Sequence, residues 1–187
     1  MVKERKRCSW VKLTNPLYVA YHDEEWGKPV HDDQLLFELL SLETYQAGLS
    51  WETVLNKREA FRVAFHNYNI NKVAAMTDQD LEDLLGNPAI IRHRGKLTAT
   101  RTNACVIQAI QSEYGSFDRY IWTFVDGQPL VNQVDNYQNL PSQTDLSKRL
   151  SKDLKKRGAS FTGPVAMYSF LQAAGLVNDH EEACHFK

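Results

Sequence analysis

The strongest constraint on the fold is a set of metal-binding residue types divided between the two ends of the chain. Cys8 and His22 lie near the N-terminus, and His180 and Cys184 lie four residues apart near the C-terminus. Two sulfur and two nitrogen ligands suit tetrahedral zinc. On a helix, His180 and Cys184 would share one face. The set predicts a zinc clasp, formed by segments 8–22 and 180–184, that ties the two ends of the chain together.

The same four residues have a less specific explanation. The interval from Cys8 to His22 fits no zinc-finger spacing, and stray cysteines and surface histidines are common. Spacing alone therefore leaves both interpretations open. The remaining cysteine, Cys105, lies in an apolar run with helical character, so we expect it to be a buried core thiol.

Length and composition bound the class of protein. A chain of 187 residues with 43% apolar content forms one domain or two small lobes around a real core. The net charge of -1 excludes a general polycation, so any contact with nucleic acid must come from local basic clusters. The odd cysteine count, with no signal-peptide pattern and no long apolar span, favours a reduced, cytoplasmic protein with no membrane partner. We expect a monomer.

Helix start and stop signals recur along the chain and predict an all-α fold. Capping residues precede apolar runs, and glycines follow them. Asp32, Ser50, and Thr77 with Asp80 are the clearest starts. The expected helices cover about 33–40, 51–65, 78–85, 96–113, 117–124, 144–157 and 164–175. The stretch 128–143 is polar and irregular, and the sequence shows no alternating strand pattern.

The stretch at about 145–175 is a candidate helix-hairpin-helix motif. Gly158 and Gly163 interrupt it, which lets the backbone approach a ligand, and the helix that follows presents free N–H groups. Lys156 and Arg157 add positive charge. Such a hairpin can hold a DNA backbone without reading its sequence. An ordinary helical turn beside a solvated basic face explains the segment equally well.

A second basic cluster, at residues 92–96, also opens a helix. Two basic clusters at helix boundaries favour DNA binding more than either one alone.

One carboxylate in the segment 42–51 is a site candidate. Glu43 lies on the apolar stripe of its helix, four residues after Leu39, whereas Glu38 lies on another face and is expected to be solvated. A carboxylate on a buried stripe must find a partner or lose its charge. It is therefore a functional candidate, or a structural carboxylate paired with an arginine or with backbone amides.

Apolar and aromatic residues surround this carboxylate in the sequence. Gly48 and Leu49 form a turn that exposes an apolar side chain, which suits a wedge between bases but is more often core. Four aromatic residues supply flat surfaces on which a planar ring can stack, although aromatic residues are usually core as well. They are Trp10, Tyr18, Tyr21 and Trp51.

Taken together, these residues resemble those of the 3-methyladenine DNA glycosylase I family. The resemblance covers almost the whole chain and rests on long ordered blocks. They are Cys8-Ser9-Trp10, residues 18–27 (YVAYHDEEWG), residues 43–51 (ETYQAGLSW), residues 90–96 (IIRHRGK) and residues 175–180 (GLVNDH).

The resemblance implies a fold, a metal and an activity. The expected fold is the helix-hairpin-helix DNA glycosylase fold, with residues 1–187 forming one glycosylase domain of two helical lobes. Cys8, His22, His180 and Cys184 fall where the family binds a structural zinc. The implied activity is hydrolysis of the N-glycosidic bond of 3-methyladenine in alkylated double-stranded DNA, after the base is flipped out. The partners are that DNA and the released 3-methyladenine.

The resemblance also gives the residues roles. Glu43 would accept a hydrogen bond from the exocyclic amine and favour the cationic ring, while Tyr21 and Trp51 complete the catalytic group. Trp10 and Tyr18 join these three in the base pocket. Residues expected to contact DNA are Gln46, Gly48, Leu49, Lys156, Arg157, Gly158 and Gly163.

The implied enzyme is monofunctional. The hairpin has no lysine at the position where bifunctional lyases place their nucleophile, since residues 160–162 are Ser-Phe-Thr. Asp179 adjoins a zinc ligand and is interpreted as structural.

Two other classes of function fit parts of the chain. A non-enzymatic DNA-binding module would need the hairpin but has no use for a buried Glu43. A zinc-dependent hydrolase would need Glu25 or Glu43 to activate a metal-bound water, which a fourth protein ligand on the metal would exclude.

Overall fold

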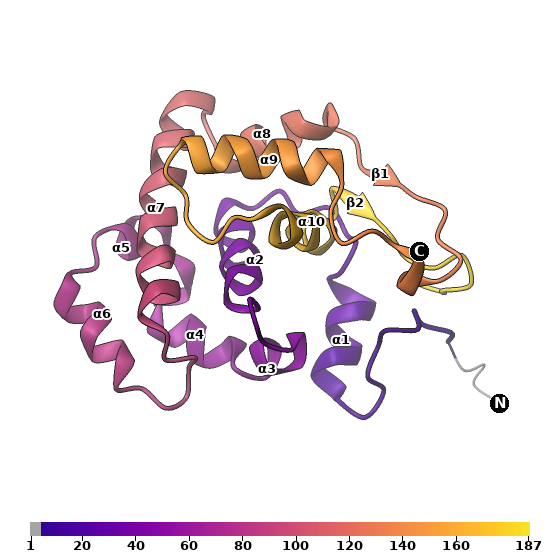
Figure 1. Ribbon diagram of the computed structural model, residues 1–187, viewed down its shortest axis with the longest axis horizontal. Coiled ribbons are helices and arrows are strands. Elements are labelled where there is room, and N and C mark those ends of the chain that lie inside the picture. Colours follow the sequence, from indigo (N-terminus) through magenta and orange to yellow (C-terminus); the bar gives the residue numbers. More distant parts are fainter. Residues whose placement is uncertain (1–4) are drawn as a thin grey trace.

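The computed structural model describes residues 5–187, and they form a mainly helical molecule (Figure 1). The α-helices are α1 (Pro16–Glu24), α2 (Asp33–Tyr45), α3 (Trp51–Asn56), α4 (Arg58–Ala64), α5 (Ile70–Ala74), α6 (Asp78–Leu85), α7 (Arg94–Tyr114), α8 (Phe117–Trp122), α9 (Asp145–Lys156) and α10 (Pro164–Ala173). Short 3-10 turns cover His66–Tyr68, Thr123–Val125 and Tyr137–Asn139. The expectation of a mainly helical fold is confirmed.

The capping signals form the bonds that the sequence predicts. The Asp32 side chain accepts from the Leu35 amide, and Thr77 and Asp80 form a reciprocal capping box. The helix expected over 51–65 is divided at Lys57 into α3 and α4. Helix boundaries are thus set largely by local residues, because each cap satisfies N–H groups within its own turn.

Two strands of two residues each depart from the all-α prediction. β1 (Leu130–Val131) pairs in parallel with β2 (Val177–Asn178), with Leu130 opposite Val177. Elements this short show no alternation in the sequence. Pairing of β1 with β2 joins the irregular stretch after α8 to the segment that follows α10.

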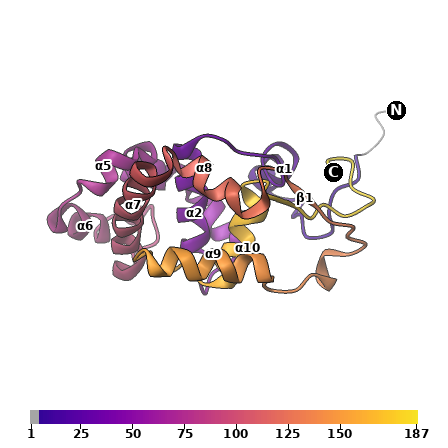
Figure 2. The same ribbon diagram turned by 90° about the horizontal axis from the view of Figure 1, so that it is seen from above.

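The helices are arranged around α2 (Figure 2). Helices α5 and α6 pack on α7 at one end, whereas α1, the strands and the C-terminal segment lie at the other. Between them, α10 packs against both α2 and α9. Residues Leu36 to Tyr45 of α2 are all buried, so any polar group on this stretch is removed from bulk water.

Glu38 is not solvated, contrary to the sequence prediction. It is buried on α2, where its carboxylate receives Arg58 Nε at 2.5 Å and Arg62 Nε at 3.0 Å. Arg58 also donates to Glu25. The prediction was wrong because the neighbouring helix α4, which a helical wheel of α2 does not include, supplies the counter-charges.

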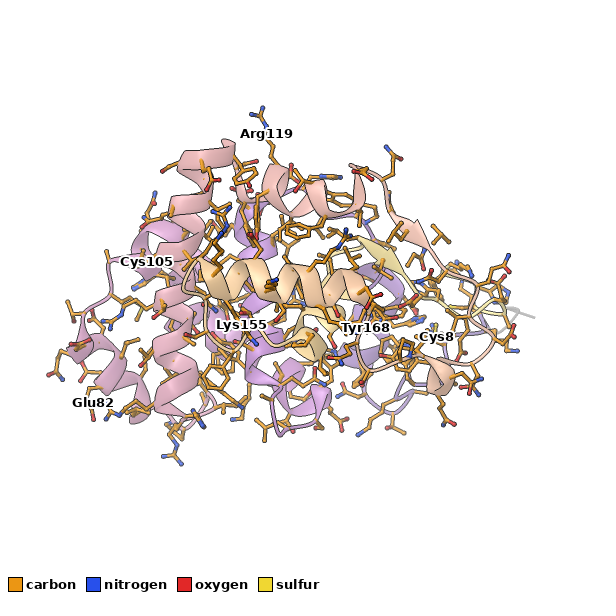
Figure 3. All side chains as sticks on the ribbon, turned by 45° about the horizontal axis from the view of Figure 1, so that its top comes forward. Cys8, Glu82, Cys105, Arg119, Lys155 and Tyr168 are labelled. Carbon is orange, nitrogen blue, oxygen red and sulfur yellow. The ribbon has the colours of Figure 1, made fainter. Side chains whose placement is uncertain are left out.

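Cys105 is not a core thiol. It is exposed on α7, with its sulfur 3.8 Å from the Ala74 carbonyl oxygen, and Figure 3 labels it. The residues on either side of it, Ala104 and Val106, are the ones that face the core. No helix within residues 5–187 is long and apolar enough to span a membrane.

Candidate base pocket and metal centre

A cavity of about 240 Å³ lies beside the buried part of α2. Helix α1 contributes tyrosines, α2 a glutamate, the start of α3 a tryptophan, and α10 two polar side chains. The lining residues are Trp10, Tyr18, Tyr21, Trp26, Glu43, Gln46, Trp51, Tyr137, Ser169 and Gln172. The structure therefore brings together all five residues that the sequence assigned to a base pocket, from segments up to 41 positions apart. The cavity is smaller than the roughly 300–1,000 Å³ that drug-sized ligands occupy, which suits a single base.

Glu43 is a carboxylate in this cavity with no ionic partner. Its side chain is 5% exposed, its Oε2 has no hydrogen-bond partner, and no basic group within residues 5–187 forms an ion pair with it. Burial raises the pKa of Glu43 from 4.5 to about 8. The structural alternative, pairing with an arginine, is thus realised by Glu38 and not by Glu43.

Aromatic rings form the walls around Glu43. Tyr21 and Trp51 lie with their ring centroids 5.0 Å apart, and Trp10 contacts Tyr18 at 5.7 Å. The indole N–H groups of Trp10 and Trp51 are buried and have no hydrogen-bond partner in the described part of the chain. Burial, and then the nearby Glu43, raise the pKa of the Tyr21 hydroxyl, so it stays protonated and can donate. Buried unpaired polar atoms beside flat apolar walls indicate a planar ligand with polar edges.

Sequence reasoning missed two walls of the cavity. Trp26 packs edge-on against Trp10 at 4.8 Å, and Tyr137 lies 5.8 Å from Trp10. Trp26 belongs to the block 18–27 that carries the family resemblance, so that block was a usable signal. Tyr137 lies in the irregular stretch, where no periodicity points to burial.

Lys96 is not part of a DNA-facing basic cluster. It is buried, and its ammonium donates to the carbonyls of Tyr45 at 2.9 Å and Ala47 at 2.7 Å. Burial lowers the pKa of Lys96. The carbonyl of Tyr45, the last residue of α2, has no partner inside the helix, and Lys96 satisfies it together with the Ala47 carbonyl in the turn that follows. It thereby fixes the turn at 46–49 that follows Glu43.

A second, more apolar cavity of about 430 Å³ adjoins the first and shares Glu43, Gln46 and Ser169 with it. Leu49 and Phe161 border it, each 40% exposed. Leu49 is therefore not a core residue. Gly48 has φ +76° with open space where a Cβ would stand, so the turn can approach a ligand closely.

The segment between α9 and α10 is a tight, well-anchored turn. Gly158 has φ +96°, Gly163 precedes α10, and Asn103 holds Ser160 by bonds to its N–H and carbonyl at 2.8 and 3.1 Å. Lys156 is exposed on α9, as is Lys155, which Figure 3 labels. The turn is where the sequence placed the hairpin.

Arg157 differs from the two lysines. Its guanidinium donates to Asp153 at 2.8 Å and to Glu113 at 2.6 Å. It also lies over the rings of Tyr114 and Tyr120. These interactions join α9 to α7 and occupy the group that was expected to meet a phosphate.

Cys8, His22, His180 and Cys184 converge in one buried cluster. Their ligand atoms all lie within 4.8 Å of one another, although residues 179–184 form no helix. The prediction of a shared helical face was therefore wrong. A bridge between Val134 and Glu181, next to the β1–β2 pair, aligns this extended segment instead.

The surroundings of the cluster fit a metal ion. His22 Nδ1 contacts Asp23 Oδ1 at 2.8 Å, and His180 Nδ1 contacts Asn178 Oδ1 at 2.9 Å, which leaves the Nε2 atom of each ring for a metal. His22 Nε2 lies 3.6 Å from Cys184 Sγ. His180 Nε2 is buried, and no residue from 5 to 187 forms a hydrogen bond with it. Two thiols and two oriented imidazoles are the donor set of a closed, tetrahedral site.

Comparison with known proteins assigns the chain to a family. A family model described as methyladenine glycosylase matches residues 10–187. The chain belongs to this family. The resemblance found in the sequence is thus confirmed.

Individual relatives extend this result over nearly the whole chain. The DNA-3-methyladenine glycosylase 1 of Escherichia coli K12 is 49% identical over 179 residues, covering 96% of this chain and 95% of the relative. The DNA-3-methyladenine glycosylase of Haemophilus influenzae is 47% identical over 181 residues, covering 97% of each.

Solved structures agree with the fold. A structure from Staphylococcus aureus, described as showing 3-methyladenine recognition by 3-methyladenine DNA glycosylase I, superposes with a TM-score of 0.93 at 42% identity, covering 97% of this chain and 96% of that one. A single-residue variant of a 3-methyladenine DNA glycosylase I in complex with 3-methyladenine gives a TM-score of 0.94 at 41% identity, with 97% of each chain covered.

Proposed function

We propose that this protein is a monofunctional DNA glycosylase that hydrolyses the N-glycosidic bond of 3-methyladenine in alkylated double-stranded DNA. The base is flipped out of the duplex into the cavity, and free 3-methyladenine is the product. The observation that carries the proposal is Glu43, a buried carboxylate between aromatic walls with no counter-ion among residues 5–187.

The charge of Glu43 matches that of the substrate. Adenine methylated at N3 in DNA is a cation, so it stabilises the ionised carboxylate and lowers the pKa of Glu43 below about 8. Neutral bases gain nothing from this pairing and face a protonated carboxyl. The cavity therefore selects alkylated purines by charge.

Catalysis follows from the same match. A cationic base is already a good leaving group, so no acid needs to protonate it. Glu43 holds the ring in place, Trp51 and Trp10 stack on it, and Tyr21 and Tyr18 line the cavity. These residues act through positioning and electrostatics, with each stacked ring contributing roughly 1–3 kcal/mol.

Two features argue against a lyase or an aspartate-assisted mechanism. Residues 160–162 are Ser-Phe-Thr, which offer no amine nucleophile. Asp179 is fully buried, and its carboxylate accepts from Tyr168, Gln172 and Asn132. This network gives Asp179 a structural part.

The DNA would approach the apolar cavity between the turn at 46–49 and the hairpin. Leu49, presented by Gly48, fills the gap left by the flipped nucleotide, and Gln46 lies at the boundary of the two cavities. Lys156 and the backbone at Gly158 and Gly163 hold the phosphates, so the stretch 145–175 acts as a helix-hairpin-helix motif.

Arg157 contributes less directly to that interface. Arg157 keeps α9 against α7. It can bind a phosphate only after its ion pair with Glu113 is broken. Residues 1–187 act as one glycosylase domain of two helical lobes, a monomer that works on chromosomal DNA in the bacterial cytoplasm.

The metal cluster is proposed to hold one structural zinc. Four protein ligands leave no open position for water, so the site does not fit a zinc hydrolase. Zinc would join Cys8 and His22 to the C-terminal segment. These two ligands lie next to Trp10, Tyr18 and Tyr21 in the sequence. The metal would thereby support one wall of the base pocket.

Base release tests the proposal. Methylated duplex DNA is incubated with the protein and with Glu43→Gln, and the released bases are separated by chromatography. We expect free 3-methyladenine from the wild type and a loss of about 10²–10³-fold in the variant, the scale of one preorganised electrostatic contact. Binding to undamaged duplex without base release would instead support the DNA-binding module. Equal release of 7-methylguanine would contradict the assignment of 3-methyladenine as the substrate.

A further inference from the structure

Gln172 is a buried amide at the edge of the base pocket. It lies on α10, is 2% exposed, and borders the cavity that contains Glu43. Its Nε2 donates to Asp179 Oδ2 at 2.7 Å. Asp179 is itself immobilised, since it accepts from the Tyr168 hydroxyl on the same oxygen and from Asn132 Nδ2 at 2.7 Å on the other.

These contacts decide which end of the amide faces the cavity. The two oxygens of an ionised carboxylate accept hydrogen bonds and donate none. Asp179 therefore requires the NH₂ end of Gln172, and the carbonyl oxygen Oε1 must take the opposite position. Within residues 5–187, no donor reaches Oε1. Because Gln172 is buried as a residue and lines the cavity, this unpaired oxygen is available to a ligand bound there.

We propose that Gln172, positioned by Asp179, is a specificity-determining residue that accepts a hydrogen bond from the exocyclic amine of the bound base. This assignment rests on the proposed function and names a second acceptor beside Glu43. The amine at position 6 of 3-methyladenine has two N–H bonds, so it can serve Glu43 and Gln172 together.

The same arrangement rejects purines with an oxygen at position 6. Such a base turns its lone pairs toward the fixed Oε1 of Gln172. Gln172 cannot adapt by rotating its amide, because rotation would place its oxygen against the Asp179 carboxylate. A fixed acceptor discriminates between the two kinds of base, since the wrong base leaves the Gln172 oxygen without a donor.

The test compares the affinities of two free bases. 3-Methylhypoxanthine keeps the ring and the N3 methyl group of 3-methyladenine but has oxygen in place of the amine. Binding is followed by the fluorescence of Trp10 and Trp51, which line the cavity. Gln172→Met removes the acceptor at similar volume. We expect the wild-type preference for 3-methyladenine to shrink by about 5- to 20-fold, the value of one hydrogen bond.

A second variant reverses the amide. In Asp179→Asn the new side chain can donate to Gln172 Oε1, which turns Nε2 into the cavity, so the preference should move toward 3-methylhypoxanthine. Asn132→Ala is the matched control, because it removes another bond of Asp179 but leaves Gln172 anchored. Its ratio of affinities should equal that of the wild type.

The ratio of the affinities for 3-methyladenine and 3-methylhypoxanthine distinguishes a change in specificity from damage to the fold. A merely structural Gln172 would weaken both bases equally, and an unchanged ratio in Gln172→Met would overturn the assignment. If that variant does not fold, an unchanged ratio in Asp179→Asn overturns it. Failure of the wild type to release 3-methyladenine from DNA would instead contradict the proposed function.

Discussion

Two glutamates on one helix show how far single residues can be predicted. Glu43 was expected to be buried because it continues the apolar stripe of α2, and the cavity confirms its burial. Glu38 was expected in solvent, yet it is buried against Arg58 and Arg62. Hydrophobic periodicity shows which face of its own helix a residue occupies. It carries no information about counter-charges that a later helix brings.

The bare carboxylate of Glu43 makes stability depend on pH. Its pKa is about 8 in the folded protein, against an ordinary value of 4.5, so the carboxyl loses its proton at lower pH in the unfolded state. This group therefore lowers stability progressively as pH rises from about 4.5 to 8, with a total cost on the order of a few kcal/mol.

Glu43→Gln should remove this dependence. We expect the variant to unfold at the same urea concentration as the wild type near pH 4.5 and at a higher concentration at pH 8 or above. If the variant and the wild type had equal urea midpoints at both pH values, Glu43 would be ionised in the folded protein and its charge balanced by favourable interactions.

At the scale of elements, local signals predicted the helices. They did not predict the long-range hydrogen bonds that fix the turns between the helices. Caps such as Thr77 with Asp80 act within one turn, so the sequence reveals them. Lys96 looked like surface charge because it stands among other basic residues. Its carbonyl partners lie 51 and 49 positions away, beyond any local pattern.

Lys96→Met should therefore weaken the turn at 46–49. Losing both hydrogen bonds leaves the end of α2 unsatisfied, and we expect a destabilisation of about 1–3 kcal/mol in urea unfolding. Excision from duplex DNA should fall as well, because this turn carries Leu49. Arg92→Met, an exposed residue of the same basic cluster, is the control and should change stability by less than about 0.5 kcal/mol. A matching loss in the control would contradict the capping role.

At the scale of the molecule, the N-terminal segment from residue 5 onward and the C-terminal segment lie in the same half of the structure (Figures 1 and 2). Lys6 and His185 exchange hydrogen bonds at 2.9 Å, next to the metal cluster. The residue types predicted this convergence, whereas the backbone conformation at 180–184 could not be predicted. That segment is shaped by the Val134–Glu181 bridge and the ligands themselves, and its own sequence has no helical or strand period.

Cys184→Ala should therefore loosen more than the C-terminus. We expect the purified variant to contain no zinc, to melt at lower temperature and to bind 3-methyladenine more weakly, because Trp10, Tyr18 and Tyr21 lose their anchor. Cys105→Ala, at an exposed cysteine outside the cluster, should match the wild type. Full stability and activity of the wild type after chelation would refute the structural role of the metal.

The central claim is that an uncompensated carboxylate at Glu43 receives a cationic base, and a titration of that carboxyl group tests it most directly. Carbon NMR of the labelled side chain should give a midpoint of about 8 in the free protein. Saturation with a cationic methylated purine should shift it well below that value. A midpoint near 4.5 that the ligand leaves unchanged would contradict the claim.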